Sequence, residues 1–382
     1  MDHSQPLGSR SNTPPVRVLV VGQTPPPFHG QAIMIQMLVE GPLPDVEIHH
    51  VRMQFSESLG EIGKVRIGKI WHLFELIARI VWCRIRFRPT ILYYPPAGPN
   101  FVPLVRDAVL LFFTRWLFPT TVFHFQAAGC SELISQLKNP WKWWIRRALG
   151  APDVAIELSE YGPPDGATLG AKRIVYIPNA SKDEAHKFPR DRQVDAIQPS
   201  RILYLGTVTE EKGVSVLLDA CRILLEAQTP FRLDIVGGFG SEMYRQQLEQ
   251  DIASKRLQEH VTMHGQKVGQ EKWNMFAQAD IFCFPSYYRC ESFGCVLVEA
   301  MTFSLPVVST RWRGIPTIVS HGKNGFLAPT QDANAVAEFL TQLVNSPELR
   351  RMMGTEGRRR FEQEFTQEIF LERMRSLFLS LA

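Results

Sequence analysis

The sequence predicts an α/β protein with two domains, each built on a parallel β-sheet that is covered by helices. Its 382 residues exceed one ordinary domain and suit two domains that each bury a core. Short β-branched segments alternate with helical segments in both halves of the chain, as they do in parallel sheets with helices on both faces. The polar stretch at residues 183–200 has no clear period, so it predicts a linker between the two halves.

The N-terminal domain is predicted at residues 16–182. It follows a polar lead at residues 1–15, which lacks the apolar core of a signal peptide and is expected to be disordered. Strands are expected in the segments VRVLVVGQ, TILYYP, TTVFHF, PDVAIELSEYG and RIVYIPNA. The most apolar stretch, 101–118, is interrupted by three charged residues, so it predicts a buried helix rather than a membrane span.

The C-terminal domain is predicted at residues 201–365, where a second series of alternating segments begins. Helices are expected at 214–227 and 242–254, and strands in RILYLG, FRLDIVGG, VTMHG, ADIFCFPS and LPVVST. The closing segment, 366–382, predicts a helix that packs back towards the N-terminal domain. Parallel sheets bind ligands outside the carboxyl ends of their strands, so two facing sheets would form a binding cleft.

Composition limits the classes of protein to consider. Hydrophobic residues at 45% and charged residues at 21% are typical of a soluble globular protein. Lys and Arg outnumber Asp and Glu by 19 to 13 in residues 1–182 but not in residues 183–382, where they number 23 against 25. Six scattered cysteines form no CxxC pair and no zinc-type spacing with histidine, which favours reduced thiols in a cytoplasmic protein.

The segment RCESFGCVLVEAM carries the most informative charged residues. It follows a predicted strand, and Gly294 is expected to begin a helix, so the backbone N–H groups after Glu291 would form an anion site at the helix N-terminus. Glu291 would lie just before this helix and Glu299 inside it, where two carboxylates could hold hydroxyl groups on either side of a diphosphate. In the alternative interpretation, Glu291 is a solvated cap and Glu299 an ordinary helix residue.

A basic residue accompanies this segment. LGTVTEEKG follows a strand and puts Lys212 near the start of the next helix, where its charge could neutralise a departing diphosphate, although it could also be a solvated surface lysine. The chain contains no D-x-D triplet that would hold a diphosphate-bound metal. We therefore expect no metal ion, and we expect Lys212 and backbone N–H donors to stabilise the charge of the diphosphate.

These segments, together with YIPNA, LSEYG and GKNGFLAP, resemble the retaining glycosyltransferases of family 4, which have the GT-B fold. The resemblance covers most of the chain and is densest at residues 201–329. It implies that Glu291 contacts the donor sugar, that Glu299 contacts the ribose, and that Lys212 binds phosphate. The donor-binding residues implied or expected are Gly30, Gly206, Thr207, Lys212, Glu291, Ser292, Phe293, Gly294 and Glu299.

The sequence departs from the family pattern at three positions. Thr207 stands where the family usually has an arginine, so one phosphate-binding cation is missing, and His29 replaces the first of the family's paired glycines, while Gly30 keeps the second. Thr317 stands where the family often has glutamate. His124 resembles a family histidine near the reacting sugar and would hydrogen-bond the sugar or support the leaving group, although a histidine in an apolar strand is also commonly a core residue.

The N-terminal half also contains two clusters of aromatic and basic residues. The first holds Trp71, Phe74 and Trp82 among Lys64, Arg66, Lys69, Arg79, Arg84, Arg86 and Arg88, with Glu75 as its acid. The second holds Trp141, Trp143 and Trp144 among Lys138, Lys142, Arg146 and Arg147. Such mixtures suit peripheral contact with an anionic membrane, or amphipathic helices whose aromatic residues lie in the core. Nucleic-acid binding is not expected, since no recognised module accompanies the charge.

The sequence thus predicts a metal-independent, retaining hexosyltransferase with His124, Lys212 and Glu291 as catalytic residues. Its co-substrate would be a UDP- or GDP-linked sugar, and its acceptor a glycan or lipid-linked glycan, in surface polysaccharide or glycolipid synthesis at the inner face of the membrane. Two alternatives remain. A GT-B nucleotide-sugar epimerase would form product from donor alone, and a degenerate scaffold, which Thr207 makes plausible, would bind donor without turnover.

Overall fold

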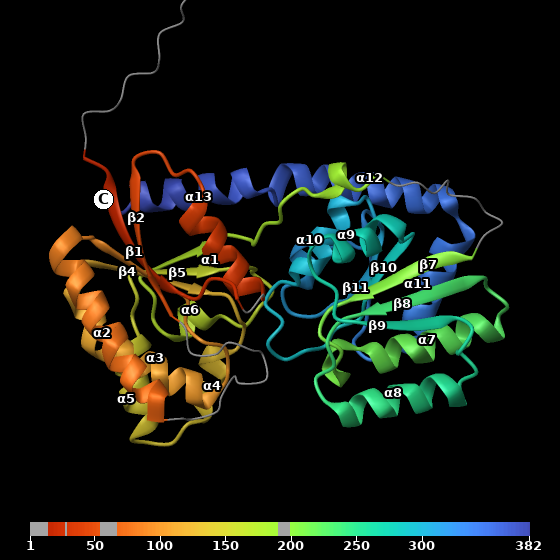
Figure 1. The fold of residues 1–382 in the computed structure, drawn as a ribbon, viewed down its shortest axis with the longest axis horizontal. Coiled ribbons are helices and arrows are strands. Elements are labelled where there is room, and N and C mark those ends of the chain that lie inside the picture. Colours follow the sequence, from red (N-terminus) through yellow and green to blue (C-terminus); the bar gives the residue numbers. More distant parts are fainter. Residues whose placement is uncertain (1–13, 27–28, 54–66, 190–198) are drawn as a thin grey trace, which may run out of the picture.

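A computed structural model describes residues 14–26, 29–53, 67–189 and 199–382. Within these ranges the chain forms two α/β domains, each with a six-stranded parallel sheet (Figure 1). The strand orders are β2-β1-β3-β4-β5-β6 and β12-β11-β10-β7-β8-β9. Most of the predicted lead and half of the predicted linker, at residues 1–13 and 190–198, lie outside the described ranges.

The central strands of the N-terminal sheet are buried between two layers of helices, while its two edge strands are partly exposed. Its strands are β1 Val16–Gly22, β2 Val46–Arg52, β3 Ile91–Tyr94, β4 Thr120–Phe125, β5 Val154–Glu157 and β6 Arg173–Tyr176. The connecting helices are α1 Gly30–Glu40, α2 Ile67–Phe87, α3 Phe101–Thr114, η2 Arg115–Leu117, α4 Cys130–Gln136, α5 Trp141–Leu149 and α6 Asp165–Thr168. One face of the sheet packs against α2, α3, α4 and α5, and the other against α1 and the C-terminal helix.

The stretch that was predicted to be a buried helix is buried on one side only. Leu104, Ala108 and Leu111 of α3 pack into the core, but Phe113 is 58% exposed and Trp116, in η2, is 54% exposed. The prediction is therefore wrong for the outer face of this helix. Among the residues that the structure describes, no helix is both long and apolar enough to cross a membrane.

The C-terminal sheet repeats this architecture. Its strands are β7 Ser200–Leu205, β8 Phe231–Val236, β9 Val261–Gly265, β10 Ile281–Phe284, β11 Val307–Thr310 and β12 Gly325–Ala328. Its helices are α7 Val214–Glu226, α8 Glu242–Ser254, α9 Gly269–Gln278, α10 Cys295–Thr302, α11 Ala333–Asn345 and α12 Pro347–Glu364, with short 3-10 turns η4 Glu210–Lys212 and η5 Ile315–Thr317. A further 3-10 turn, η3 Ala185–Lys187, lies between the two sheets along the chain.

The last helix, α13 Gln367–Leu379, returns to the N-terminal domain and packs against α1 (Figure 1). Phe370, Met374 and Phe378 of α13 are buried in the same cluster as residues of α1 and β1. The ring of Phe378 lies edge-on to that of Tyr93, with centroids 6.2 Å apart. The chain therefore passes from the N-terminal to the C-terminal domain after β6 and returns to the N-terminal domain with α13.

Candidate functional site

The start of α10 is shaped to receive an anion. Gly294 caps the helix with a left-handed backbone conformation (φ 90°), which residues other than glycine rarely adopt. Phe293 is 1% exposed, and its ring packs edge-on against Phe365 at 5.8 Å, which anchors the turn. Within the described part of the chain, the backbone N–H groups of Phe293 and Gly294 donate to no protein acceptor. Such free donors at a helix N-terminus attract negative charge.

Glu291 and Lys212 form a partly buried ion pair beside this turn. The Lys212 Nζ lies 2.7 Å from Glu291 Oε2, and the Ser286 hydroxyl donates to the same oxygen at 3.0 Å. Glu291 is 7% exposed, and the side chain of Lys212 is 17% exposed. Lys212 also lies 4.6 Å from the ring centre of Tyr288. The solvated cap and the solvated surface lysine of the alternative interpretations are therefore not observed.

Local backbone geometry brings Lys212 to the site. It ends the 3-10 turn η4, and Gly213 follows with φ 81°. A β-carbon at Gly213 would lie 2.1 Å from the carbonyl oxygen of Pro285, so only glycine lets this turn pack against the segment after β10. The Tyr287 N–H donates to the Glu211 carbonyl at 2.8 Å, which joins the same two segments.

Glu299 forms the second ion pair of the site. It is 8% exposed, and its Oε1 lies 2.5 Å from Lys272 Nζ on α9. Its other oxygen, Oε2, is buried and has no hydrogen-bond partner among the described residues. Because a buried carboxylate oxygen is costly to leave without a hydrogen bond, Oε2 is suited to accept a hydrogen bond from a hydroxyl group of a ligand. Glu299 is therefore not an ordinary exposed helix residue.

Residues of the N-terminal domain complete the site. The first residue of α1, Gly30, faces the start of α10, since a β-carbon there would lie 3.6 Å from Cys295 Sγ. Asn179 donates to the side-chain oxygen of Gln126 at 2.9 Å and to Cys295 Sγ at 3.5 Å. Burial raises the pKa of Cys295 to about 11, and Glu299 and Glu291 add to the rise, so this thiol stays protonated.

His124 lies beneath the site rather than at its surface. It is fully buried, the Tyr93 hydroxyl lies 2.6 Å from its Nδ1, and the Gln126 amide nitrogen lies 3.1 Å from its Nε2. Burial lowers the pKa of His124 to about 3, so the ring is neutral. Gln126 therefore stands between His124 and the start of α10. The structure also places His29 as the N-cap of α1, where its ring accepts the Ala32 N–H at 3.3 Å.

Loops that follow the strands of the two sheets contact one another, and we call this set of contacts the interdomain seam. The Ser292 hydroxyl donates to the Gln126 carbonyl at 2.6 Å, and Arg289 donates to the Pro99 carbonyl at 2.9 Å. A third contact is the ion pair between Arg313 and Glu132, at 3.1 Å. The seam brings the Glu291 turn directly against the N-terminal domain.

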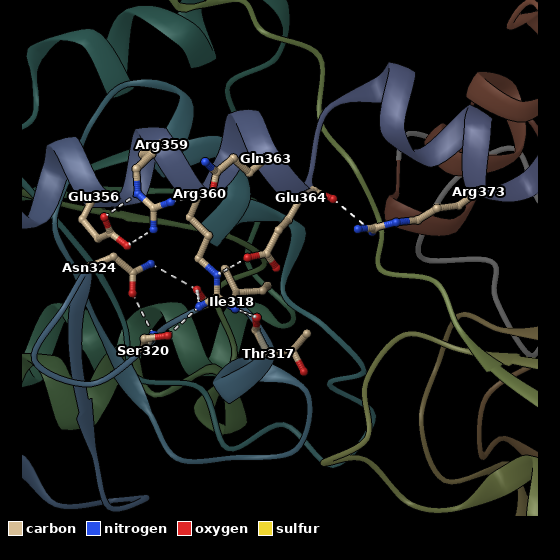
Figure 2. A network of polar contacts seen from close by, with 10 residues as sticks. All are labelled: Thr317, Ile318, Ser320, Asn324, Glu356, Arg359, Arg360, Gln363, Glu364 and Arg373. Carbon is tan, nitrogen blue, oxygen red and sulfur yellow. Dashed lines mark hydrogen bonds and ion pairs between the residues drawn. The ribbon is translucent and has the colours of Figure 1, made fainter.

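Thr317, one of the departures from the family pattern, also takes part in the seam. Its hydroxyl lies 2.6 Å from that of Ser159, in the N-terminal domain. Arg360 of α12 holds the segment around Thr317 in place, donating to the carbonyls of Thr317 and Ile318 and to the Ser320 hydroxyl (Figure 2). The position thus supplies a neutral contact between the domains.

Gly206 and Thr207 follow β7, and the Thr207 side chain is exposed and uncharged. The structure thus gathers Gly30, Lys212, Glu299 and the turn at residues 291–294 around the start of α10 and leaves His124 in the layer below. Four polar residues at or under this site were not predicted: Gln126, Asn179, Lys272 and Ser286. Asn179 lies in YIPNA and Ser286 ends ADIFCFPS, so both could have been found, whereas nothing near Lys272 in the sequence marks it.

Residues 187–360 match the family model described as glycosyl transferases group 1. The amylovoran biosynthesis glycosyltransferase AmsK of Erwinia amylovora is 35% identical over 189 residues, which are 48% of this chain and 46% of AmsK. The capsular polysaccharide biosynthesis glycosyltransferase CapM of Staphylococcus aureus is 26% identical over 204 residues, which are 52% of this chain and 49% of CapM. The chain thus spans about half the length of these relatives.

A solved structure shares the whole fold. HepE of Anabaena, crystallised in complex with UDP-glucose, aligns with a TM-score of 0.70 and 17% identity over 96% of this chain and 100% of HepE. This likeness, with the two parallel six-stranded sheets, confirms the predicted GT-B fold class.

Proposed function

We propose that this chain, whose residues 187–360 match the glycosyl transferases group 1 model, transfers a sugar from a nucleotide-sugar donor with retention of configuration. The observation that carries this proposal is the group of contacts around α10. Lys212, free backbone N–H groups and two buried glutamates lie together there, and this combination of groups is suited to binding a sugar diphosphate. The UDP-glucose in HepE supports a nucleotide-linked sugar, UDP- or GDP-linked, as the donor.

The charges of the site explain how it would accept and release a diphosphate. Two lysines balance two glutamates before the donor binds. The donor phosphates would accept hydrogen bonds from the Lys212 ammonium and from the N–H groups of Phe293 and Gly294. Glu291 would accept hydrogen bonds from hydroxyl groups of the sugar, and Glu299 from those of the ribose. As the bond to the sugar breaks, negative charge grows on the departing phosphate, and these fixed donors stabilise it without a metal ion.

The transfer itself would occur at the interdomain seam. The acceptor hydroxyl attacks the anomeric carbon from the side that the diphosphate leaves, and its proton passes to the departing phosphate oxygen. No enzyme nucleophile is required. His124, being neutral and covered by Gln126, would act by orienting Gln126 beneath the sugar and so supporting the leaving group indirectly. Closure of the two domains would exclude water from this step.

We propose that the acceptor is a glycan or a lipid-linked glycan and that the reaction belongs to surface polysaccharide or glycolipid synthesis in the cytoplasm. CapM and AmsK, named for capsular polysaccharide and amylovoran biosynthesis, support this class of pathway. The exposed aromatic and basic residues of the N-terminal domain support a lipid-linked acceptor at the inner face of a membrane.

The proposal can be tested with nucleotide sugars and lipid-linked glycan acceptors in the presence of EDTA. We expect release of the nucleoside diphosphate, an acceptor-dependent product, and a product anomer, identified by NMR, that matches the donor. Glu291→Ala should abolish transfer and leave the fold intact by circular dichroism. Product from donor alone, inversion of configuration, or unchanged turnover in Glu291→Ala would each contradict the proposal.

A further inference from the structure

Three helices on one side of the N-terminal sheet carry an exposed apolar surface. It is formed by the outer sides of α2, of α3 with η2, and of α5, which gather at one side of the domain (Figure 1). All five exposed tryptophans of the chain lie here, and Trp71 is the most exposed at 77%. We call this surface the aromatic face.

On α2 the exposed apolar residues follow a helical repeat. Trp71, Phe74, Trp82 and Ile85 lie on the outer side, while Leu76 and Ile80 fill the core on the opposite side. A helix that is apolar on two sides is expected to be covered on both. No described part of the chain covers the outer side of α2, so this side is suited to an external partner. Trp71, Phe74 and Trp82 are therefore exposed, whereas the alternative interpretation of the sequence placed them in the core.

Cations surround the aromatic face. Described side chains on α2 and α5 include six basic residues, Arg79, Arg84, Arg86, Lys142, Arg146 and Arg147, against one acid, Glu75. The Arg147 guanidinium lies 4.2 Å from the ring centre of Trp116, and Arg84 donates to the Leu117 carbonyl at 2.7 Å. The cations are thus interleaved with the aromatic residues. Lys64 and Arg66 of the predicted cluster lie outside the described residues.

This chemistry favours an anionic bilayer over a second copy of the chain. Two aromatic faces brought together would place like charges opposite one another, whereas lipid phosphates complement them. Tryptophan is enriched at the depth of lipid headgroups, where its ring meets the acyl boundary and its N–H meets water.

The aromatic face continues to the interdomain seam. Phe101 and Val102, both more than 40% exposed, begin α3 immediately after the Pro99–Asn100 turn. The Phe101 ring packs edge-on against Trp141 of α5 at 5.6 Å. Since the Pro99 carbonyl accepts the Arg289 guanidinium, this end of the face adjoins the turn that carries Glu291.

We infer that the aromatic face docks on the surface of an anionic lipid bilayer and holds the interdomain seam next to the headgroups. A lipid-linked acceptor could then keep its apolar tail in the bilayer while its polar head reaches the seam. This second statement rests on the proposed function, but docking itself does not.

Co-sedimentation with vesicles tests the docking. We expect the whole chain to sediment with an equal mixture of phosphatidylcholine and phosphatidylglycerol, weakly with phosphatidylcholine alone, and less at high salt. Arg79→Gln with Arg86→Gln should lower the partition coefficient about 25-fold, since each cation near an anionic surface contributes about fivefold. Trp71→Ser with Trp82→Ser should lower it about tenfold or more. The matched control is Met243→Ser with Met352→Ser, two exposed apolar residues of the C-terminal domain, which should bind as the wild type does.

Binding of UDP and GDP in solution, without vesicles, separates this inference from the proposed function. Both aromatic-face variants should keep the nucleotide affinity and the circular dichroism of the wild type. Equal sedimentation of the wild type and both variants would overturn the inference. So would a wild type that sediments equally with phosphatidylcholine alone and with the mixture that contains phosphatidylglycerol. A wild-type dimer in light scattering that the tryptophan substitutions convert to monomer would also overturn it, because a second copy would then cover the face.

Discussion

The Lys212 ammonium lies 2.7 Å from the Glu291 carboxylate, although 79 residues separate them along the chain. One belongs to the turn after β7 and the other to the turn after β10, which are adjacent strands in the sheet. The pair exists because parallel neighbours end at the same edge. It places a cation and a carboxylate beside the free N–H groups at the start of α10.

The unpaired oxygen of Glu299 predicts recognition of ribose. Wild-type protein should bind UDP more tightly than 2′-deoxy-UDP by about tenfold, because a hydroxyl bound to a buried carboxylate is a strong hydrogen bond. Glu299→Gln should lose most of this preference in calorimetric titrations. Glu338→Gln, an exposed residue of α11, is the control. If Glu299→Gln kept the full preference, the ribose contact would be wrongly assigned.

The ion pair across the interdomain seam predicts a charge-swap experiment. Glu132→Lys would face Arg313 with a like charge, so we expect the domains to separate, with a larger radius of gyration in small-angle scattering and a lower kcat. Nucleotide affinity should change little, since the donor contacts lie mainly in the C-terminal domain. Adding Arg313→Glu should restore both compactness and kcat. Unchanged scattering and kcat in Glu132→Lys would argue against closure through this contact.

Burial of His124 predicts acid sensitivity. Its pKa is about 3 in the folded protein and ordinarily 6.5, so the unfolded chain binds a proton that the folded one does not. The stability that its neutral form contributes is present above about pH 6.5 and is lost as the pH falls towards 3, by up to about 1.4 kcal/mol per pH unit. Urea unfolding of His124→Gln should therefore show a shallower loss over this range. The exposed His186→Gln should behave as the wild type, and parallel pH curves for all three proteins would contradict the explanation.

Much of the fold could be predicted because the buried strands are short β-branched runs with clear breaks. Two strands were missed, each for its own reason. The edge strand β2, VEIHHVR, is only half-buried and carries charged and imidazole side chains that hide its period, and β12, GFLA, contains no β-branched residue. The α12 helix buries Arg350, Gly354 and Gly357 as well as Met353 and Phe361, so few of its buried residues are large and apolar and its helical period is weak in the sequence.

The candidate site was predictable where a motif carries its own geometry, as in the turn before α10. Lys272 could not be predicted, since only the packing of α9 brings it to Glu299. The position of His124 beneath Gln126 could not be predicted either, because the alternation of residues in a strand does not indicate which polar residue covers another. The exposure of Trp71 and Trp82 depended likewise on which side of α2 meets the sheet.

The most direct test of the diphosphate site is calorimetric titration of wild type and Lys212→Ala with UDP and GDP. We expect the wild type to bind at least one of them, and Lys212→Ala to bind it about 10- to 100-fold more weakly, the effect of a charge-assisted contact to phosphate. Lys255→Ala removes a paired lysine of the same domain and should leave the affinity unchanged. No binding by the wild type, or equal affinity in Lys212→Ala, would contradict the assignment of this site.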